Sequence, residues 1–273
     1  MTSTAPTPLV ELREAARRFV RARLTASSLP AFPGTVPGTL EAAYACQDAA
    51  IAQWPDDVQG WKVGRIGEPW FSRLGEDRLV GPIFSRAVRA ARPAEVVDFP
   101  VFEGGFAAVE AEFIVKLGVD AEPARNEWSP EDAALVVGAM HVGVETAGSP
   151  LATINELGPT VVVSDFGNNA GLIVGPSIAN WRSFGNDQLT SETLVDERRV
   201  GTGNAASIPG GPLAALAFAL GRCARRGLPL KAGQWISTGA TTGIHDIRVG
   251  QGARIVFRGV GEIRCRAVRA QPC

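Results

Sequence analysis

Val109-Glu110-Ala111-Glu112-Phe113 places two carboxylates inside an apolar part of the sequence. It lies inside an otherwise apolar run from Phe106 to Leu117, which is typical of a buried strand. Residues i and i+2 of a strand point to one face, so Glu110 and Glu112 are predicted to converge. Two unpaired carboxylates on one buried face repel each other and are costly to desolvate. Mg²⁺ or Mn²⁺ would remove that cost, because these cations prefer carboxylate oxygens. A solvated strand face is the alternative.

Length and composition fit one large domain or two smaller ones in a chain of 273 residues. The net charge of -1 predicts neither a nucleic-acid partner nor a membrane partner. Four scattered cysteines lack metal-ligand spacing and suit free thiols in a reducing compartment: Cys46, Cys223, Cys265 and Cys273. The first residues show no signal peptide, and no apolar stretch reaches the length of a membrane span. We expect a soluble, cytoplasmic protein.

Periodicity along the chain predicts a mixed α+β fold without the regular strand–helix alternation of a doubly wound sheet. A disordered tail is expected at Thr2–Pro8. Helices are expected at Leu9–Leu24, at Glu41–Trp54 after the N-cap Thr39, at Pro130–Met140 after the N-cap Ser129, and at Pro212–Arg226. Strands are expected at Gln59–Gly64, Thr160–Asp165, Gly171–Val174, Trp235–Thr238, Ala253–Phe257 and Ile263–Val268. The composition shifts after Pro93, which suggests an N-terminal α/β region at 1–92 and a β-rich region at 93–273.

Lys62 lies in the short strand between glycines and is predicted to point away from the face shared by Trp61 and Val63. An ordinary surface lysine is the alternative. Two polar, glycine-containing loops follow at 164–171 and 237–243. Backbone N–H groups and hydroxyls in such loops can hold a carboxylate, although a plain turn is the default interpretation.

Several catalytic motifs are missing. The sequence contains no GxSxG and no Walker sequence, and the loose GxGxxA match at 201–206 lacks the strand and helix of a dinucleotide site. The histidines are His141 and His245, for which structural hydrogen bonding is the favoured role. His141 is also considered as a partner of a ligand at Glu145.

Taken together, these stretches resemble the 2-keto-4-pentenoate hydratase branch of the fumarylacetoacetate hydrolase superfamily, which also contains 4-oxalocrotonate decarboxylases. The resemblance covers most of the chain. The segments that carry it are 39–45, Gly60-Trp-Lys-Val-Gly64, Val109–Phe113, Gly143-Val-Glu145, 165–175, 212–216, 230–233 and Ser237-Thr-Gly239.

The resemblance implies a small N-terminal α/β region and a larger, rolled mixed β-sheet. It also implies a divalent metal, Mg²⁺ or Mn²⁺, held by Glu110, Glu112 and Glu145. The active-site lysine of the family falls on Lys62, whose pKa a closed pocket near a metal can lower. The substrate pocket of the family falls on Asp165, Asn168, Asn169, Thr238 and Gly239.

The chain also departs from the family. An acidic residue that usually precedes the strand entered at Gly81 is absent, since Leu79-Val80 stand there. The family commonly reads Asp-Ser-Arg after the third metal ligand, whereas this chain has Ala147-Gly148-Ser149. Asn168-Asn169 replace serines of the family, and Gly211 replaces a histidine. The metal site therefore transfers better than the substrate.

We expect a metal-dependent hydro-lyase that adds water to a small unsaturated 2-oxo acid, such as 2-hydroxypenta-2,4-dienoate or a relative with a polar tail. Three alternatives remain: decarboxylation of a 2-oxo-3-enedioate, hydrolysis of an acylpyruvate, and an inactive scaffold that keeps the fold. The hydrolase would need a general base, often a histidine on the N-terminal side, and no histidine precedes His141. We also expect a homo-oligomer.

Overall fold

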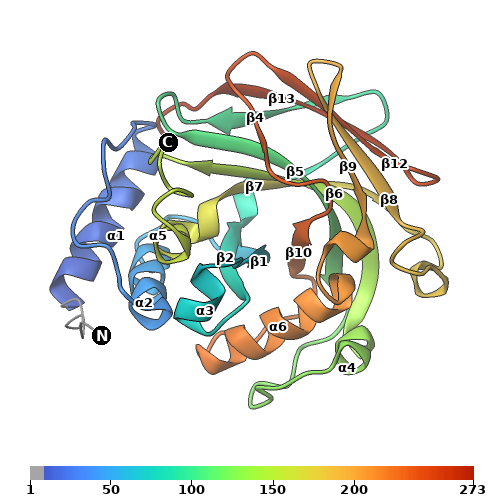
Figure 1. Cartoon of the computed structure of the whole chain (residues 1–273), viewed down its shortest axis with the longest axis horizontal. Coiled ribbons are helices and arrows are strands. Elements are labelled where there is room, and N and C mark those ends of the chain that lie inside the picture. The colour runs from blue at the N-terminus through green and yellow to red at the C-terminus, as the bar shows by residue number, and fades with distance from the viewer. Residues whose placement is uncertain (1–8) are drawn as a thin grey trace.

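Two long antiparallel strands, β5 (Phe106–Leu117) and β6 (Val137–Ser149), run through the centre of the computed structural model, which describes residues 9–273 (Figure 1). They belong to the larger of two sheets, whose strand order is β2-β1-β10-β5-β6-β7-β3, with β11 paired to β5. The smaller sheet has the order β4-β13-β12-β8-β9. The predicted tail at Thr2–Pro8 lies outside the described residues.

The remaining strands are β1 (Val58–Arg65), β2 (Arg78–Phe84), β3 (Val88–Ala90), β4 (Val96–Val101), β7 (Asn169–Ser177), β8 (Thr190–Val195), β9 (Arg198–Asn204), β10 (Trp235–Ala240), β11 (His245–Asp246), β12 (Gly252–Phe257) and β13 (Gly261–Arg269). The α-helices are α1 (Leu9–Leu24), α2 (Leu40–Ile51), α3 (Trp70–Leu74), α4 (Pro130–Leu135), α5 (Pro159–Ser164) and α6 (Gly211–Arg225). Short 3₁₀ helices lie at Ser85–Ala87, Phe166–Asn168, Trp181–Ser183 and Ala205–Ser207.

The larger sheet is buried and has helices at its margins. In Figure 1, α1 and α2 lie on the left, α6 lies along the bottom, and the smaller sheet lies at the upper right. Apolar side chains of both sheets and of α6 form the main core, and α1, α2 and α5 enclose a second cluster with Phe84 and Phe166. The fold is therefore the α+β fold with a curled mixed sheet that the sequence predicts.

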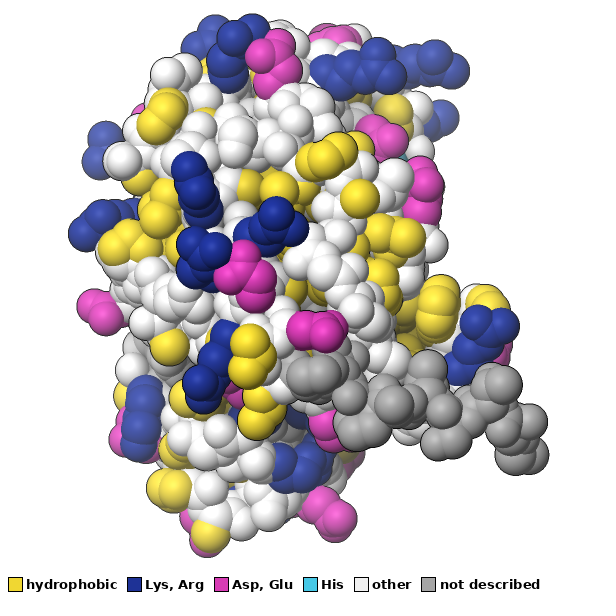
Figure 2. All heavy atoms as spheres, turned by 90° about the vertical axis from the view of Figure 1, so that its left-hand side faces the viewer, with side chains coloured by type: hydrophobic (Ala, Val, Ile, Leu, Met, Phe, Trp, Pro, Cys, Tyr) yellow, Lys and Arg dark blue, Asp and Glu magenta, His cyan; other side chains and the backbone are white. Residues whose placement is uncertain are grey.

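Surface charge is mixed on the face that carries the N-terminal region. Basic, acidic and apolar side chains are interspersed there (Figure 2). This mixture is in keeping with the net charge of -1. No helix among residues 9–273 is both long and apolar enough to cross a membrane.

The helical and capping predictions are largely confirmed. Helix α1 begins and ends where the sequence predicts, and the Thr39 and Ser129 side chains accept hydrogen bonds from Ala42 N and Asp132 N as N-caps. Cys46, Cys223, Cys265 and Cys273 are all free thiols.

The predicted strand at Thr160–Asp165 is wrong, because this segment forms α5. The helix begins at Pro159, where a fixed φ favours the first turn, and the next residues are buried on several sides. Burial against α2 therefore outweighs the strand preference of three valines and a threonine.

The helix predicted to reach Met140 ends at Leu135. Val137 already belongs to β6, where the backbones of Gly138 and Gly118 lie so close that a Cβ on Gly138 would be 2.7 Å from Gly118 Cα. From Val137 onward, backbone pairing with β5 determines the structure, although the sequence has helical periodicity there. The hairpin of β8 and β9 is not predicted at all; its turn uses Asp196 and Glu197 at positive φ.

The larger sheet contains strands from both sides of the expected boundary near residue 92. β1 and β2 precede the boundary, and β1 pairs with β10, which follows it. The division into two units therefore separates segments that share backbone hydrogen bonds, and it stays a prediction.

Candidate metal centre

Three carboxylates meet where the central strands of the larger sheet pair. Glu110 and Glu112 point to the same face of β5, and the register of β5 with β6 sets Glu145 directly opposite Glu110. One oxygen from each of the three carboxylates lies within 4.8 Å of the others. Their exposed fractions are 4%, 0% and 0%, so bulk water does not solvate this charge.

Each carboxylate has at least one buried oxygen that accepts no hydrogen bond within residues 9–273. Ser237 Oγ donates to Glu112 Oε2 at 2.6 Å, and Gly239 N donates to the same oxygen at 2.8 Å. Asn169 Nδ2 donates to Glu145 Oε1 at 3.0 Å. The buried atoms that lack a hydrogen-bond partner in the described part of the chain include Glu110 Oε1, Glu112 Oε1 and Glu145 Oε2. Three buried carboxylates with oxygens free of hydrogen bonds, one of which contacts Lys62, fit the ligand set of a hard divalent cation.

The pKa values of these carboxyl groups reflect their crowding. Burial raises the pKa of Glu110 to about 8, with the charge of Glu145 acting in the same direction and Lys62 opposing it. Burial also raises the pKa of Glu112 well above its usual range, and the charges of Glu145 and Glu110 add to that effect. The site is therefore costly to ionise until a cation compensates the charge.

Lys62 reaches this centre from β1. The strand pairs in parallel with β10, so Lys62 lies beside Ser237, and its Nζ is 3.3 Å from Glu145 Oε2. This is an ion-pair contact. Burial lowers the pKa of Lys62, but the charges of Glu145, Glu110 and Glu112 outweigh burial and raise it above the ordinary value. The sequence predicts a lowered pKa beside a bound metal, and that stays a prediction; without a cation the surrounding carboxylates raise the pKa.

A cavity of about 390 Å³ opens beside Lys62 and Glu110. Asn168, Thr238 and Gly239, which the sequence assigns to the substrate pocket, contribute to its lining. Asn168 Nδ2 donates to Asn155 Oδ1, another lining residue, at 3.1 Å.

The turn that carries Asn168 packs directly against β2. A Cβ on Gly81 would lie 2.2 Å from Phe166 O, so only glycine allows this approach. Gly167 has a φ of 65°, and a Cβ there would lie 3.3 Å from Lys62 Cδ. These contacts bring the turn next to the lysine.

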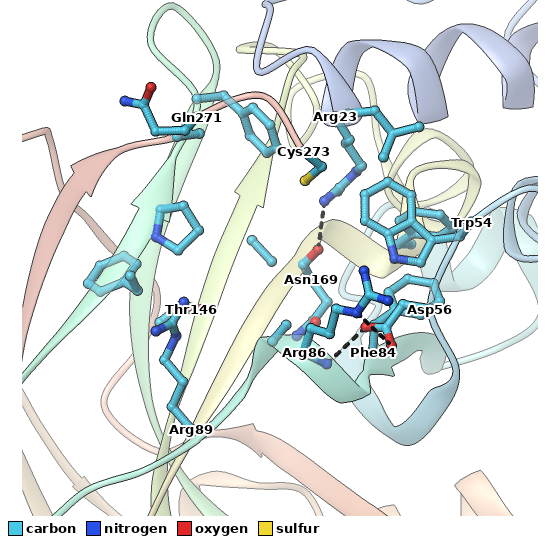
Figure 3. A pocket seen from close by; sticks show the side chains of 18 of the residues that line it. Arg23, Trp54, Asp56, Phe84, Arg86, Arg89, Thr146, Asn169, Gln271 and Cys273 are labelled. Carbon is cyan, nitrogen blue, oxygen red and sulfur yellow. Dashed lines mark hydrogen bonds and ion pairs between the residues drawn. The ribbon is translucent and has the colours of Figure 1, made fainter.

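Asn169 and Asp165, the other two predicted pocket residues, lie elsewhere. Neither lines this cavity. The Asn169 side chain contacts Glu145 instead and also lines a second, largely apolar cavity of about 200 Å³ near Trp54 and Phe84 (Figure 3). Thr146 lines that cavity too, on the face of β6 opposite to Glu145.

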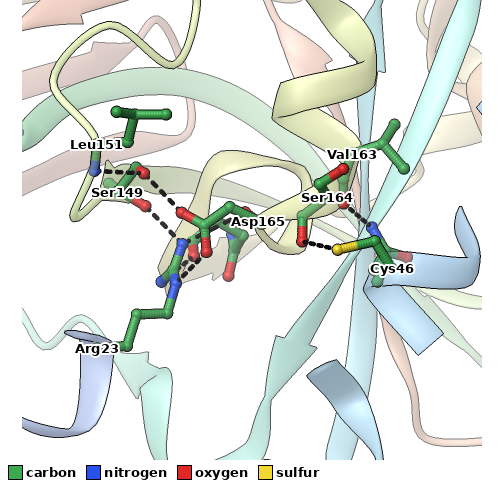
Figure 4. A network of polar contacts seen from close by, with 10 residues as sticks. Arg23, Cys46, Ser149, Leu151, Val163, Ser164 and Asp165 are labelled. Carbon is green, nitrogen blue, oxygen red and sulfur yellow. Dashed lines mark hydrogen bonds and ion pairs between the residues drawn. The ribbon is translucent and has the colours of Figure 1, made fainter. Parts of the chain in front are cut away.

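Asp165 forms a buried ion pair that the sequence did not reveal. Arg23 Nε donates to Asp165 Oδ1 at 2.6 Å, and Ser149 Oγ donates to Asp165 Oδ2 at 2.6 Å (Figure 4). Arg23 also donates to the carbonyl oxygens of Asn169 and Gly148. The arginine thus ties α1 to β6 and to the start of β7, where Asn169 lies. Its place in an amphipathic helix gave no signal of this role.

The histidines take structural contacts. His141 Nδ1 lies 3.0 Å from Gly175 O, and its ring packs edge-on against Trp235. His245 Nε2 lies 3.1 Å from Thr242 Oγ1. Neither ring lines the cavity beside the carboxylates. The idea that His141 supports Glu145 is therefore wrong, since Asn169 makes that contact.

Comparison with known proteins identifies the fold. No protein-family model and no curated protein matches the sequence. Among solved structures, 4-oxalocrotonate decarboxylase from Pseudomonas putida G7 complexed with magnesium and adipate superposes with a TM-score of 0.79 at 18% identity, covering 97% of this chain and 100% of that one. Its complex with calcium and acetate gives 0.78 at 19%, with the same coverage. Fumarylpyruvate hydrolase from Pseudomonas aeruginosa, in complex with Mn²⁺ and pyruvate, gives 0.54 at 18%, covering 79% and 91%. At such identities the likeness establishes the fold, which is of the fumarylacetoacetate hydrolase type.

Proposed function

We propose that this chain is a divalent-metal-dependent lyase of the fumarylacetoacetate hydrolase superfamily that acts on a small unsaturated 2-oxo acid. The observation that carries the proposal is the set of three buried carboxylates, each with an oxygen that accepts no hydrogen bond from the described residues, beside a buried lysine and an open cavity. Glu110, Glu112 and Glu145 would hold the cation. A divalent cation bound there supplies Lewis-acid stabilisation of negative charge on the oxygen of a 2-oxo acid.

Lys62 acts as a cation and proton donor in this proposal. Its Nζ lies 3.3 Å from Glu145 Oε2, among carboxylates that favour the ammonium form. Its Nζ can therefore donate a hydrogen bond to a developing enolate oxygen, or return a proton to a substrate carbon. Ser237, Gly239 and Asn169 fix the orientation of the carboxylates, as the outer partners of metal ligands usually do.

Hydration of the unsaturated 2-oxo acid is the reaction expected from the sequence, and decarboxylation of a 2-oxo-3-enedioate is the second candidate. Two observations favour the second. The fold likeness to 4-oxalocrotonate decarboxylase extends over 97% of the chain. The described cavity lining offers no histidine, and its single carboxylate, Glu110, is a proposed metal ligand. Decarboxylation needs an electron sink but no base to activate water. Acylpyruvate hydrolysis, which needs such a base, is disfavoured for the same reason.

In this proposal, the cavity residues beyond the metal determine which substrate tail is bound. Asn168, Thr238 and Gly239 line the cavity and can pair with polar groups of that tail. A site built to hydrogen-bond a polar tail rejects analogues without one, because its polar groups would be left unpaired. We therefore expect a preference for a polar or carboxylated tail over plain 2-hydroxypenta-2,4-dienoate.

Metal-dependent enolisation tests the part of the mechanism that hydration and decarboxylation share. Exchange of the C3 protons of 2-oxobutyrate for deuterium is followed by NMR with Mg²⁺, with Mn²⁺ and with chelator. We expect exchange that needs the metal. Glu112→Gln should bind Mg²⁺ far more weakly in calorimetry, whereas Glu156→Gln, at an exposed turn residue, should bind it normally. Absence of metal-dependent exchange, with normal Mg²⁺ binding, would favour an inactive scaffold.

A panel of 2-hydroxydienoates and 2-oxo-3-enedioates then separates the two reactions by their products, a hydrated acid or CO₂. Light scattering of the purified protein tests the proposed homo-oligomer.

A further inference from the structure

Two arginines lie directly opposite each other at the mouth of the cavity. The antiparallel register of β1 and β2 pairs Arg65 with Arg78, and both residues contribute to the lining. Like charges directly opposite each other on neighbouring strands are destabilising. The arrangement therefore favours anions beside the two guanidinium groups, and Asp77 supplies one at Arg78.

Only one of the two arginines has a protein partner that neutralises it. Arg78 Nη1 donates to Asp77 Oδ2 at 2.9 Å, and its Nη2 donates to Pro209 O. Arg65 makes no ion pair and no side-chain hydrogen bond with any other residue that the structure describes, 9–273. Its guanidinium, with five N–H donors in a planar fork, remains available to a carboxylate.

The charge balance of the cavity also indicates that Arg65 lacks a counter-charge among the described residues. Three carboxylates carry three negative charges, which a divalent cation and the Lys62 ammonium would balance. Asp77 balances Arg78. Arg65 is then the one cation of the described lining without a counter-charge.

We infer that Arg65, supported by Arg78, binds the distal carboxylate of a dicarboxylic 2-oxo acid. This inference rests on the proposed function, because it assigns the 2-oxo acid head to the carboxylate centre. Two strand residues separate Lys62 from Arg65, so three rises along β1 set their Cα atoms about 10 Å apart. Residues i and i+3 leave opposite faces of a strand, yet both residues line the same cavity, and a dicarboxylic acid of about six carbons is the substrate length that we test.

The two ends of the substrate thus have separate recognition. The head is held by the centre at Lys62 and Glu110, and the tail by a bidentate arginine. Because Arg65 is solvent-exposed at the mouth, its ion pair is partly screened and its effect should be moderate. Arg65 is a specificity-determining residue in this arrangement and should act on binding.

Two acids of equal chain length test the inference: 2-oxoadipate, with a distal carboxylate, and 2-oxohexanoate, without one. Calorimetry gives the Kd of each for the Mg²⁺-loaded protein, and deuterium exchange at C3 gives its enolisation. We expect the wild type to bind 2-oxoadipate more tightly, by about tenfold, and this preference should shrink as salt is added.

Variants then assign the preference to a residue. Arg65→Met should abolish it, and Arg65→Lys should retain part of it, because lysine keeps the charge but not the fork. Arg13→Met, at an exposed arginine of α1, is the matched control and should leave it unchanged. A wild type with equal affinity for both acids, or an Arg65→Met protein that keeps the full preference, would overturn the inference even if Arg65→Lys failed to fold.

The outcomes separate this inference from the proposed function. If both acids exchange deuterium only with metal but bind equally, the proposed function stands and the arginine assignment is wrong. If 2-oxoadipate binds preferentially through Arg65 but neither acid exchanges, the tail site stands and the lyase proposal fails.

Discussion

Replacing Glu110 by glutamine should stabilise the metal-free protein and weaken its response to Mg²⁺. The two effects have opposite signs because the same carboxylate is costly when bare and useful when it binds a cation. Glu110 is 4% exposed, and Glu110 Oε1 has no hydrogen-bond partner in the described structure. Glutamine keeps the size of the side chain and removes the ionisable group.

The magnitude follows from the pKa of about 8, which burial and the charge of Glu145 give this group. An unfolded glutamate has a pKa of about 4.3. The folded state therefore holds the extra proton between these two values, so this group's contribution is fully present below about pH 4.3 and is lost as pH rises towards 8. At pH 7 the loss amounts to about 4 kcal/mol, at about 1.4 kcal/mol for each pH unit above 4.3. Glu110→Gln removes this dependence.

Urea unfolding at pH 5 and pH 8 measures the effect, with chelator or with saturating Mg²⁺. In chelator, the wild type should lose stability between these pH values, and the variant should lose less, with the contribution of Glu112 remaining. Mg²⁺ at about 100 times its Kd should add about 2.7 kcal/mol to the wild type and little to the variant. Glu156→Gln, at an exposed position, should behave as wild type in every condition. The reasoning is refuted if the metal-free wild type is equally stable at both pH values, or if Glu110→Gln responds fully to Mg²⁺.

Three further changes test the neighbours of the centre. Lys62→Met should fold, as circular dichroism would show, but its metal-dependent deuterium exchange should fall by about 100-fold or more, because a positioned proton donor is lost; an exchange rate near that of wild type would exclude the lysine. Asn169→Ser should weaken Mg²⁺ binding by about 10- to 100-fold in calorimetry, because Glu145 loses its hydrogen bond, whereas Asn168→Ser should bind Mg²⁺ normally. Arg23→Met should cost about 3–5 kcal/mol in urea unfolding, because it leaves the Asp165 carboxylate buried without its cation, and adding Asp165→Asn should recover part of that loss. Additive losses would contradict the ion pair's role.

Near the metal centre, the sequence could predict the features that depend on local strand periodicity. The i, i+2 spacing of Glu110 and Glu112 fixes their common face in any strand, so their convergence follows from the sequence. Glu145 required the family resemblance, because the register that sets it opposite Glu110 depends on the pairing of two strands far apart in the chain. Lys62 is similar: its alternation is local, but its approach to Glu145 depends on the parallel pairing of β1 with β10.

Residues that act through tertiary contacts were missed or misassigned. Arg23 looks like any solvated arginine of an amphipathic helix, and only the fold brings it to Asp165. The adjacent asparagines were given one role, yet Asn168 lines the cavity and Asn169 bonds Glu145, because the backbone changes from a turn with a φ of 66° to a strand between them. The valines of α5 mislead because burial on several sides replaces the alternation of a half-buried strand.

The backbone pairing and a few hydrogen bonds hold the three carboxylates together in the middle of the sheet. The main chain places Glu110 and Glu145 opposite each other, because their Cα atoms are partners in the register of β5 and β6. Ser237, Gly239 and Asn169 satisfy one oxygen each of Glu112 and Glu145 and hold the remaining oxygens in place. The protein thereby carries the cost of bringing the charges together before any cation arrives. A bound cation offsets the repulsion between these carboxylates, so metal binding and folding stability are thermodynamically linked. A variant at this centre that raises the stability of the metal-free protein should therefore lower its affinity for the metal.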